Sequence, residues 1–155
     1  MASKEIKTGD KAPEFTFRST EGRDISLKDY LGKKTVVLYF YPKDHTPGCT
    51  KEACAFRDHF RRFSSKDAVI LGVSLDGPVS HRKFIQKHDL PFPLLSDEDA
   101  KVSTAYGVYK EKKLYGRTFW GIVRTTFVIG PNGRILAIYP KVKVEGHVEV
   151  VLVNL

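Results

Sequence analysis

Two apolar runs separated by a helix-like segment constrain the fold of this chain more than any other feature. Residues 35–41 and 68–75 are almost entirely aliphatic, aromatic or β-branched, without polar alternation. Such runs predict strands that are buried on both faces of a sheet. Between them, from Pro47 or Gly48 to about Phe63, apolar side chains recur every three or four residues, which indicates an amphipathic helix. The order strand, helix, strand is a βαβ unit, so we expect the two strands to be parallel.

The rest of the chain adds shorter elements around this unit. Before the βαβ unit we expect strands at 15–17 and 24–27 joined by a turn at 20–23, followed by a capped helical turn at 26–32. After it we expect a helix at 78–88, an extended segment at 90–96, a short helix at 97–106 capped by Asp97 and a polar loop or weak strand at 110–121. The chain should then form a hairpin of strands 124–129 and 134–139 and a C-terminal helix at 145–155. The hairpin is indicated by Asn132-Gly133, because this pair tolerates the positive φ of a tight turn. The sequence therefore predicts an α/β fold with a mixed central sheet flanked by helices and an N-terminal hairpin extension.

The length and the apolar pattern suggest how the chain is organised. A chain of 155 residues can bury a core of its own, so we expect a single domain at 1–155. No run of 18 or more apolar residues is present, which argues against a transmembrane helix. Residues 1–6 lack the apolar stretch of a signal peptide, so we expect a cytoplasmic protein.

The chain is basic, with a formal charge of +8 from 26 Lys and Arg against 18 Asp and Glu. Nucleic acid is the first partner that such a charge suggests. The basic residues are nevertheless scattered along the chain, and no RNA-binding aromatic signature accompanies them. We interpret them as a solvated surface that helps a negatively charged protein to dock. We expect no specific nucleic-acid partner and no membrane partner.

Both cysteines of the chain lie in the segment that follows the first apolar run. Cys49 falls at or near the N-terminus of the predicted helix, where unpaired N–H groups and the helix dipole favour a thiolate. A thiolate there is a nucleophile that can attack a weak O–O or S–S bond. Pro42 and Pro47 stiffen the preceding turn, and Gly48 permits close approach of the backbone. Thr46 places a hydroxyl three residues before the sulfur.

The second cysteine, Cys54, lies five residues after Cys49. In an intact helix this spacing corresponds to a rise of about 7.5 Å. Disulfides rarely join Cα atoms more than about 7 Å apart. The two sulfurs therefore cannot bond while the helix is intact, and we expect oxidation to unwind residues 48–56.

Several motifs resemble those of a known family. The pattern Pro42-x-x-x-Thr46-x-x-Cys49 resembles the active-site signature of the peroxiredoxins, which are thiol peroxidases of thioredoxin-like fold. The segment from Cys49 to Cys54 is similar to the bacterioferritin comigratory protein (PrxQ) subfamily. Residues 9–15 resemble the opening of that family, and residues 115–127 resemble the segment with its second active-site arginine. The resemblance covers nearly the whole chain.

This resemblance implies a role for each candidate residue. Cys49 would be the peroxidatic cysteine, which becomes a sulfenic acid when it reduces hydrogen peroxide or an organic hydroperoxide. Arg124 would stabilise the thiolate and the developing charge, Thr46 would hold the peroxide, and Pro42 would shield the sulfur from water. Cys54 would then form an intramolecular disulfide with Cys49.

The resemblance also implies the partners of the reaction. A thioredoxin-like protein would reduce the disulfide, and no metal or organic cofactor would be needed. Family members with this cysteine spacing are usually monomers. The implied biological role is antioxidant defence.

Two other functions fit parts of the pattern. A thioredoxin-type disulfide oxidoreductase would normally carry Cys-x-x-Cys, and a non-enzymatic redox-sensitive chaperone would use the fold and the basic surface alone. Zinc binding by His45 and His59 with the cysteines is disfavoured, because their spacing matches no common zinc motif. We interpret Glu52 as a residue that favours the first turn of the helix, and Trp120 as a packing residue near the rim of the site.

Overall fold

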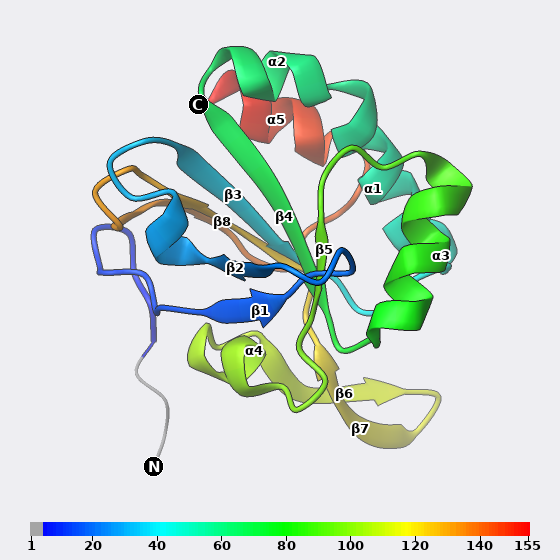
Figure 1. Cartoon of the computed structure of the whole chain (residues 1–155). Coiled ribbons are helices and arrows are strands. Elements are labelled where there is room, and N and C mark those ends of the chain that lie inside the picture. The colour runs from blue at the N-terminus through cyan, green and yellow to red at the C-terminus, as the bar shows by residue number, and fades with distance from the viewer. Residues whose placement is uncertain (1–4) are drawn as a thin grey trace.

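The computed structural model describes residues 5–155, which are built around a five-stranded mixed sheet (Figure 1). The strand order is β5-β4-β3-β8-β9. These strands are β3 (Thr35–Phe40), β4 (Ala68–Ser74), β5 (Leu94–Ser96), β8 (Thr125–Ile129) and β9 (Ile135–Tyr139). Strands β3, β4 and β5 are mutually parallel, whereas β8 runs antiparallel to both β3 and β9. The predicted parallel βαβ unit and the predicted C-terminal hairpin are both confirmed.

Each face of this sheet has its own hydrophobic core. Along β3, Val37 and Tyr39 belong to one core, whereas the alternating residues Val36, Leu38 and Phe40 belong to the other. Because successive side chains of a strand point to opposite faces, an unbroken apolar run is what a sheet covered on both sides requires. The absence of polar alternation in this segment is thereby explained.

The two faces are covered by different kinds of element (Figure 1). One face packs against four helices: α1 (Pro47–Asp58), α2 (Phe60–Ser65), α3 (Pro78–His88) and α5 (His147–Val153). The other face packs against the N-terminal hairpin β1 (Thr16–Arg18) and β2 (Asp24–Ser26), the single 3-10 turn η1 (Leu27–Asp29) and the short helix α4 (Lys101–Ala105). A mixed α/β fold with an N-terminal hairpin extension is therefore confirmed.

Some elements differ from the prediction in length or type. The helix expected to run to Phe63 is divided into α1 and α2 at His59, whose φ of −105° and ψ of 9° depart from helical values. This break lets Phe63 turn into the core, where its ring lies 5.7 Å from that of Phe56. The short helix expected at 97–106 is confined to α4, whose N-cap residue is Ala100, but the Asp97 carboxylate accepts the N–H bonds of Val102 and Ser103 at the start of this helix. The C-terminal helix α5 is shorter than expected.

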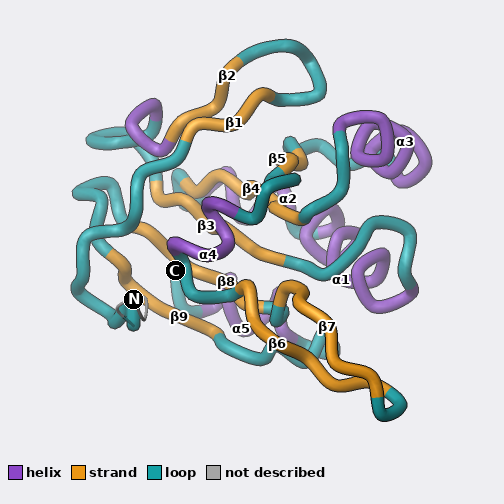
Figure 2. Tube along the Cα trace, turned by 90° about the horizontal axis from the view of Figure 1, so that it is seen from below, coloured by secondary structure: helices purple, strands orange, loops and turns teal. Residues whose placement is uncertain are grey.

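The segment interpreted as a loop or weak strand is an antiparallel hairpin of β6 (Tyr109–Leu114) and β7 (Arg117–Ile122). Its two strands pair only with each other, and Figure 2 shows the hairpin projecting from the body of the molecule. Trp120 lies on this hairpin and is 58% exposed, so its interpretation as a packing residue is wrong. Its ring is tilted against that of Tyr109, with 5.6 Å between the ring centroids.

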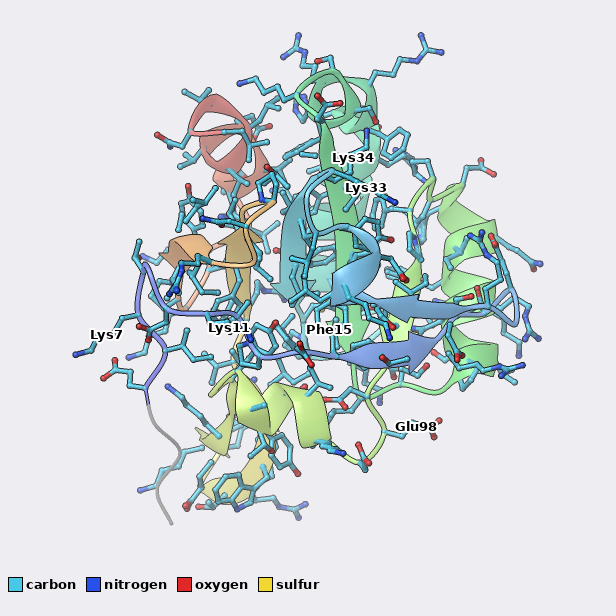
Figure 3. All side chains as sticks on the ribbon, turned by 60° about the vertical axis from the view of Figure 1, so that its left-hand side comes forward. Lys7, Lys11, Phe15, Lys33, Lys34 and Glu98 are labelled. Atoms are coloured by element: carbon cyan, nitrogen blue, oxygen red, sulfur yellow. The ribbon has the colours of Figure 1, made fainter. Side chains whose placement is uncertain are left out.

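The surface is consistent with the scattered basic residues of the sequence. In Figure 3, Lys7 and Lys33 lie well apart on two separate segments, and the acidic Glu98 lies on a third. Across residues 5–155, no helix is both long enough and apolar enough to cross a membrane.

Candidate active site

Cys49 lies where the chain passes from β3 into α1. The β3–α1 loop (residues 41–46) ends at Thr46, the N-cap residue of α1, and Pro47 occupies the first helical turn. Proline is favoured there because the first N–H groups of a helix have no partner within the helix. The side chain of Cys49, in the same turn, is only 1% exposed. The sulfur is therefore held at the positive end of the helix dipole and shielded from bulk water.

Arg124 brings a positive charge to this sulfur from the link between β7 and β8. Its Nη2 donates to Cys49 Sγ at 3.3 Å, and its Nη1 donates to Glu52 Oε1 at 2.6 Å. The approach depends on Gly48, because a Cβ added at that position would lie 3.2 Å from Nη2. The guanidinium thus bridges the cysteine and a carboxylate that lies one helical turn further along α1.

Glu52 is fully buried, and only one of its carboxylate oxygens is paired. Among residues 5–155, its Oε2 has no hydrogen-bond partner, and the hydroxyl of Tyr39, also buried nearby, has none either. Burial raises the pKa of the Glu52 carboxyl to about 7, although the charge and hydrogen bonds of Arg124 oppose this rise. The interpretation of Glu52 as a simple helix-favouring residue is therefore incomplete.

Thr46 and Pro42 lie in the β3–α1 loop, which precedes α1 in the chain. The Thr46 hydroxyl donates to the carbonyl of Lys43 at 2.8 Å, so its oxygen keeps its capacity to accept a hydrogen bond. Pro42 is partly buried. Neither residue hydrogen-bonds the sulfur, which Arg124 contacts directly.

Cys54 lies on α1 with Cys49, and both are free thiols. Cys54 is partly exposed, whereas Cys49 is buried. The helix between them is continuous, as the sequence predicts for the reduced protein.

A buried network of polar side chains holds the β3–α1 loop in place. The Asp44 carboxylate accepts hydrogen bonds from Tyr41 Oη at 2.6 Å, from Ser80 Oγ at 2.8 Å and from His81 Nδ1 at 2.7 Å. The backbone N–H of Asp44 donates to Asp76 at 2.8 Å. These bonds tie the loop to the start of α3 and to the end of β4.

His81 carries a positive charge in this network. Its Nδ1 faces the Asp44 carboxylate, and its Nε2 lies 3.1 Å from the carbonyl oxygen of Leu95. Both partners only accept, so both ring nitrogens must donate. Burial alone would raise the pKa of the Asp44 carboxyl, but the hydrogen bond and charge of His81 hold it below its ordinary value. Asp44 and His81, whose side chains are both fully buried, therefore form an ion pair.

Comparisons with known proteins show the family of this chain. The model of the AhpC/TSA family matches residues 8–138. The chain belongs to this family. It is 54% identical over 143 residues to a putative peroxiredoxin bcp of Coxiella burnetii, covering 92% of this chain and 94% of the relative. It is 50% identical over 143 residues to peroxiredoxin Bcp of Bacillus subtilis, covering 92% and 90%.

Solved peroxiredoxin structures share the fold. A cysteine-to-serine mutant of PrxQ from Xylella fastidiosa superimposes with a TM-score of 0.91 at 38% identity, covering 98% of this chain and 96% of that one. The bacterioferritin comigratory protein of Xanthomonas campestris, studied for its alkyl peroxide reduction activity, gives 0.85 at 39% identity, covering 90% and 88%. The peroxiredoxin resemblance, the thioredoxin-like fold and the thiol-dependent peroxidase class are thereby confirmed.

Sequence reasoning identified part of the candidate site and missed the rest. Cys49 and Arg124, predicted from distant segments, are in contact. Asp44 and His81, which anchor the β3–α1 loop, were not singled out, and Glu52 was interpreted only as a residue that favours the first turn of the helix. The spacing of three residues from Cys49 to Glu52 was the one available signal, since residues at i and i+3 share a helix face.

Proposed function

We propose that Cys49 is the peroxidatic thiol of this peroxidase, and that Arg124 stabilises its thiolate. The observation that carries the proposal is the hydrogen bond of 3.3 Å from Arg124 Nη2 to the Cys49 sulfur at the start of α1. A cation and a helix N-terminus both favour negative charge on sulfur, and the thiolate is the nucleophilic form. Neither group would benefit a thiol that served only as a packing residue.

The reaction follows from the polarity of the site. The Cys49 thiolate attacks one peroxide oxygen, the O–O bond breaks, and the second oxygen leaves with the bonding electrons as an alkoxide or hydroxide that takes up a proton. Arg124 lies where this negative charge develops. Thr46, whose hydroxyl donates to the Lys43 carbonyl, accepts a hydrogen bond from the O–H of the peroxide and so aligns the peroxide. Pro42 limits the access of water.

The sulfenic acid is then resolved within the chain. The Cys54 thiolate attacks the Cys49 sulfur, the S–O bond of the sulfenic acid breaks as the disulfide forms, and the hydroxide that leaves takes up a proton to become water. Because α1 is continuous between the two cysteines, its first turns unwind before the sulfurs meet. A thioredoxin-like dithiol then reduces the disulfide and restores both thiols.

The same cycle bears on the setting in which the enzyme works. Both reacting sulfurs come from one α1, so the cycle needs no second subunit and suits a monomer made of one domain over residues 1–155. Regeneration by a dithiol protein suits a reducing compartment such as the cytoplasm. The substrates include hydrogen peroxide and organic hydroperoxides, a class supported by the alkyl peroxide activity of the Xanthomonas relative.

The decisive experiment measures peroxide consumption with a thioredoxin system. Cys49→Ser should abolish turnover, because serine provides no thiolate. Undiminished turnover would refute the assignment. Cys54→Ser is the matched variant on the same helix, and it should still consume one equivalent of peroxide but fail to recycle. Mass spectrometry after one equivalent should show a sulfenic acid in this variant and an intramolecular disulfide in the parent.

A further inference from the structure

The β6–β7 hairpin exposes apolar side chains that the fold does not use. The described residues include nine large hydrophobic side chains that are exposed, and four of them lie within residues 114–120. These four are Leu114 at 56%, Tyr115 at 95%, Phe119 at 42% and Trp120 at 58% exposure. Clusters of this kind on a protein surface usually mark a binding site, whereas single exposed side chains need no explanation.

The tip of the hairpin is built at a conformational cost. Tyr115 has φ 51° and Gly116 has φ 76°, so both central residues of the tight turn are left-handed. Glycine, asparagine and aspartate suit this conformation, and a bulky aromatic side chain does not. Because Tyr115 is almost fully exposed, no packing within the protein offsets this strain. Its presence at the tip is explained if the ring has a partner outside the chain.

Basic residues surround this apolar tip. Residues 109–122 carry four cationic side chains, Lys110, Lys112, Lys113 and Arg117, against the single carboxylate of Glu111. The cross-strand register pairs Leu114 with Arg117 on one face and Lys113 with Thr118 on the other. Both faces of the hairpin therefore present a positive charge next to the tip. We call Leu114, Tyr115, Phe119 and Trp120 the apolar tip, and Lys110, Lys112, Lys113 and Arg117 the basic collar. This combination is complementary to an anionic lipid surface, whose headgroups bind cations and whose interface accommodates aromatic rings.

The hairpin is also directly connected to the active site. Strand β7 ends at Ile122, two residues before Arg124, and Lys112 Nζ donates to the Ile122 carbonyl at 2.9 Å. Burial and the charge of Arg124 lower the pKa of Lys112, while the charge of Cys49 opposes this effect. A surface that receives the hairpin would consequently lie near the opening of the peroxidase site.

We propose that the β6–β7 hairpin docks this protein onto anionic phospholipid surfaces, where the active site meets hydroperoxides of acyl chains. The choice of hydroperoxide rests on the proposed function, but the docking step does not depend on it. The expectation of no membrane partner was based on the lack of a spanning segment, and interfacial docking requires none.

The chain contains its own reporter for the test, because Trp120 is its only tryptophan. Its fluorescence should shift to the blue with vesicles of mixed phosphatidylglycerol and phosphatidylcholine, and brominated acyl chains should quench it. Pure phosphatidylcholine should produce neither effect. High salt should reverse binding. Absence of a shift and of quenching with the anionic vesicles would overturn the proposal.

Variants separate the tip from the collar. Leu114→Ser with Tyr115→Asn should remove the blue shift and keep the hairpin, because asparagine suits the left-handed turn. The triple change Lys110→Gln, Lys113→Gln and Arg117→Gln should weaken binding about a hundredfold, at roughly fivefold for each charge close to an anionic surface.

The matched control removes the same number of charges from exposed positions elsewhere: Lys33→Gln, Arg61→Gln and Arg62→Gln. This control should change vesicle binding by no more than about threefold. Equal losses from the collar and control variants would overturn a specific role for the hairpin. All variants should consume hydrogen peroxide at the parent rate without lipid, so a failure of docking is distinguishable from a failure of the proposed chemistry. Binding of an acidic thioredoxin-like protein to the hairpin without any vesicle binding would assign the surface to a protein partner instead.

Discussion

Replacing Glu52 with glutamine should remove a pH-dependent part of the folding stability. The buried Glu52 carboxyl has a pKa of about 7, whereas its ordinary value is 4.5. Between these pH values the folded protein holds a proton that the unfolded chain has released. The free energy of unfolding therefore falls as the pH rises through this window. One pKa unit corresponds to about 1.4 kcal/mol, so the loss should approach about 3 kcal/mol.

A second buried group titrates in the same window with the opposite sign. Burial, followed by the charge of Arg124, lowers the pKa of His147 from 6.5 to about 4. Its neutral ring accordingly contributes stability above pH 6.5, which is lost as the pH falls toward 4. Because the two effects oppose each other, the pH profile of the parent protein alone does not isolate Glu52. The difference in unfolding free energy between parent and Glu52→Gln does isolate Glu52, because His147 contributes equally to both proteins.

The measurement is urea unfolding of the reduced protein at about pH 4.5 and at about pH 8. The difference in unfolding free energy should move in favour of Glu52→Gln by about 3 kcal/mol between these two conditions. Glu98→Gln serves as the control, because Glu98 is exposed and should show no such movement. A difference for Glu52→Gln that stays constant with pH would refute the argument that burial holds the proton on this carboxyl.

Three further perturbations test the arrangement around the sulfur. Gly48→Ala should lower kcat/KM for peroxide by roughly tenfold or more, because the new Cβ displaces the Arg124 guanidinium. Stopped-flow kinetics measures this rate, and an unchanged rate would contradict the close approach of Arg124 to Gly48. Asp44→Asn should destabilise the protein by about 3 kcal/mol in urea unfolding, because it leaves the buried charge of His81 without its partner. A loss of unfolding free energy below about 1 kcal/mol would argue against a charged pair. Disulfide formation after peroxide addition should become more favourable from about pH 5 to about pH 7, and Glu52→Gln should flatten this dependence. Alkylation of quenched samples followed by mass spectrometry measures the disulfide. Identical pH profiles of parent and variant would contradict the coupling between Glu52 protonation and disulfide formation.

The parts of the fold that were predictable are those set by local pattern. The apolar run of β3, the proline and glycine of the following turn and the period of α1 are properties of neighbouring residues. Together they place Cys49 at a helix N-terminus with no knowledge of the rest of the chain. The same local reasoning identified α3, because Pro78 and the apolar period mark its bounds.

The remaining features depend on contacts between distant residues. Asp44 and His81 are 37 positions apart, and Glu52 and Arg124 are 72 apart. No periodicity marks a carboxylate whose cationic partner lies on another element. The β6–β7 hairpin was missed for a different reason: both of its faces are largely exposed, so its strands lack the apolar alternation by which strands are recognised.

The position of Glu52 between the two cysteines links the peroxide chemistry to protonation. The proposed Cys49–Cys54 disulfide requires the first turns of α1 to unwind, and Glu52 lies within the segment that would move. Unwinding separates its carboxylate from Arg124 and exposes it to water, where it holds a proton less tightly. The buried Glu52–Arg124 pair and the Cys49–Cys54 disulfide are therefore mutually exclusive in this geometry. The pair thus favours the helical form in which Arg124 contacts the Cys49 sulfur, and in the proposed cycle it must be broken before that cysteine can be recycled.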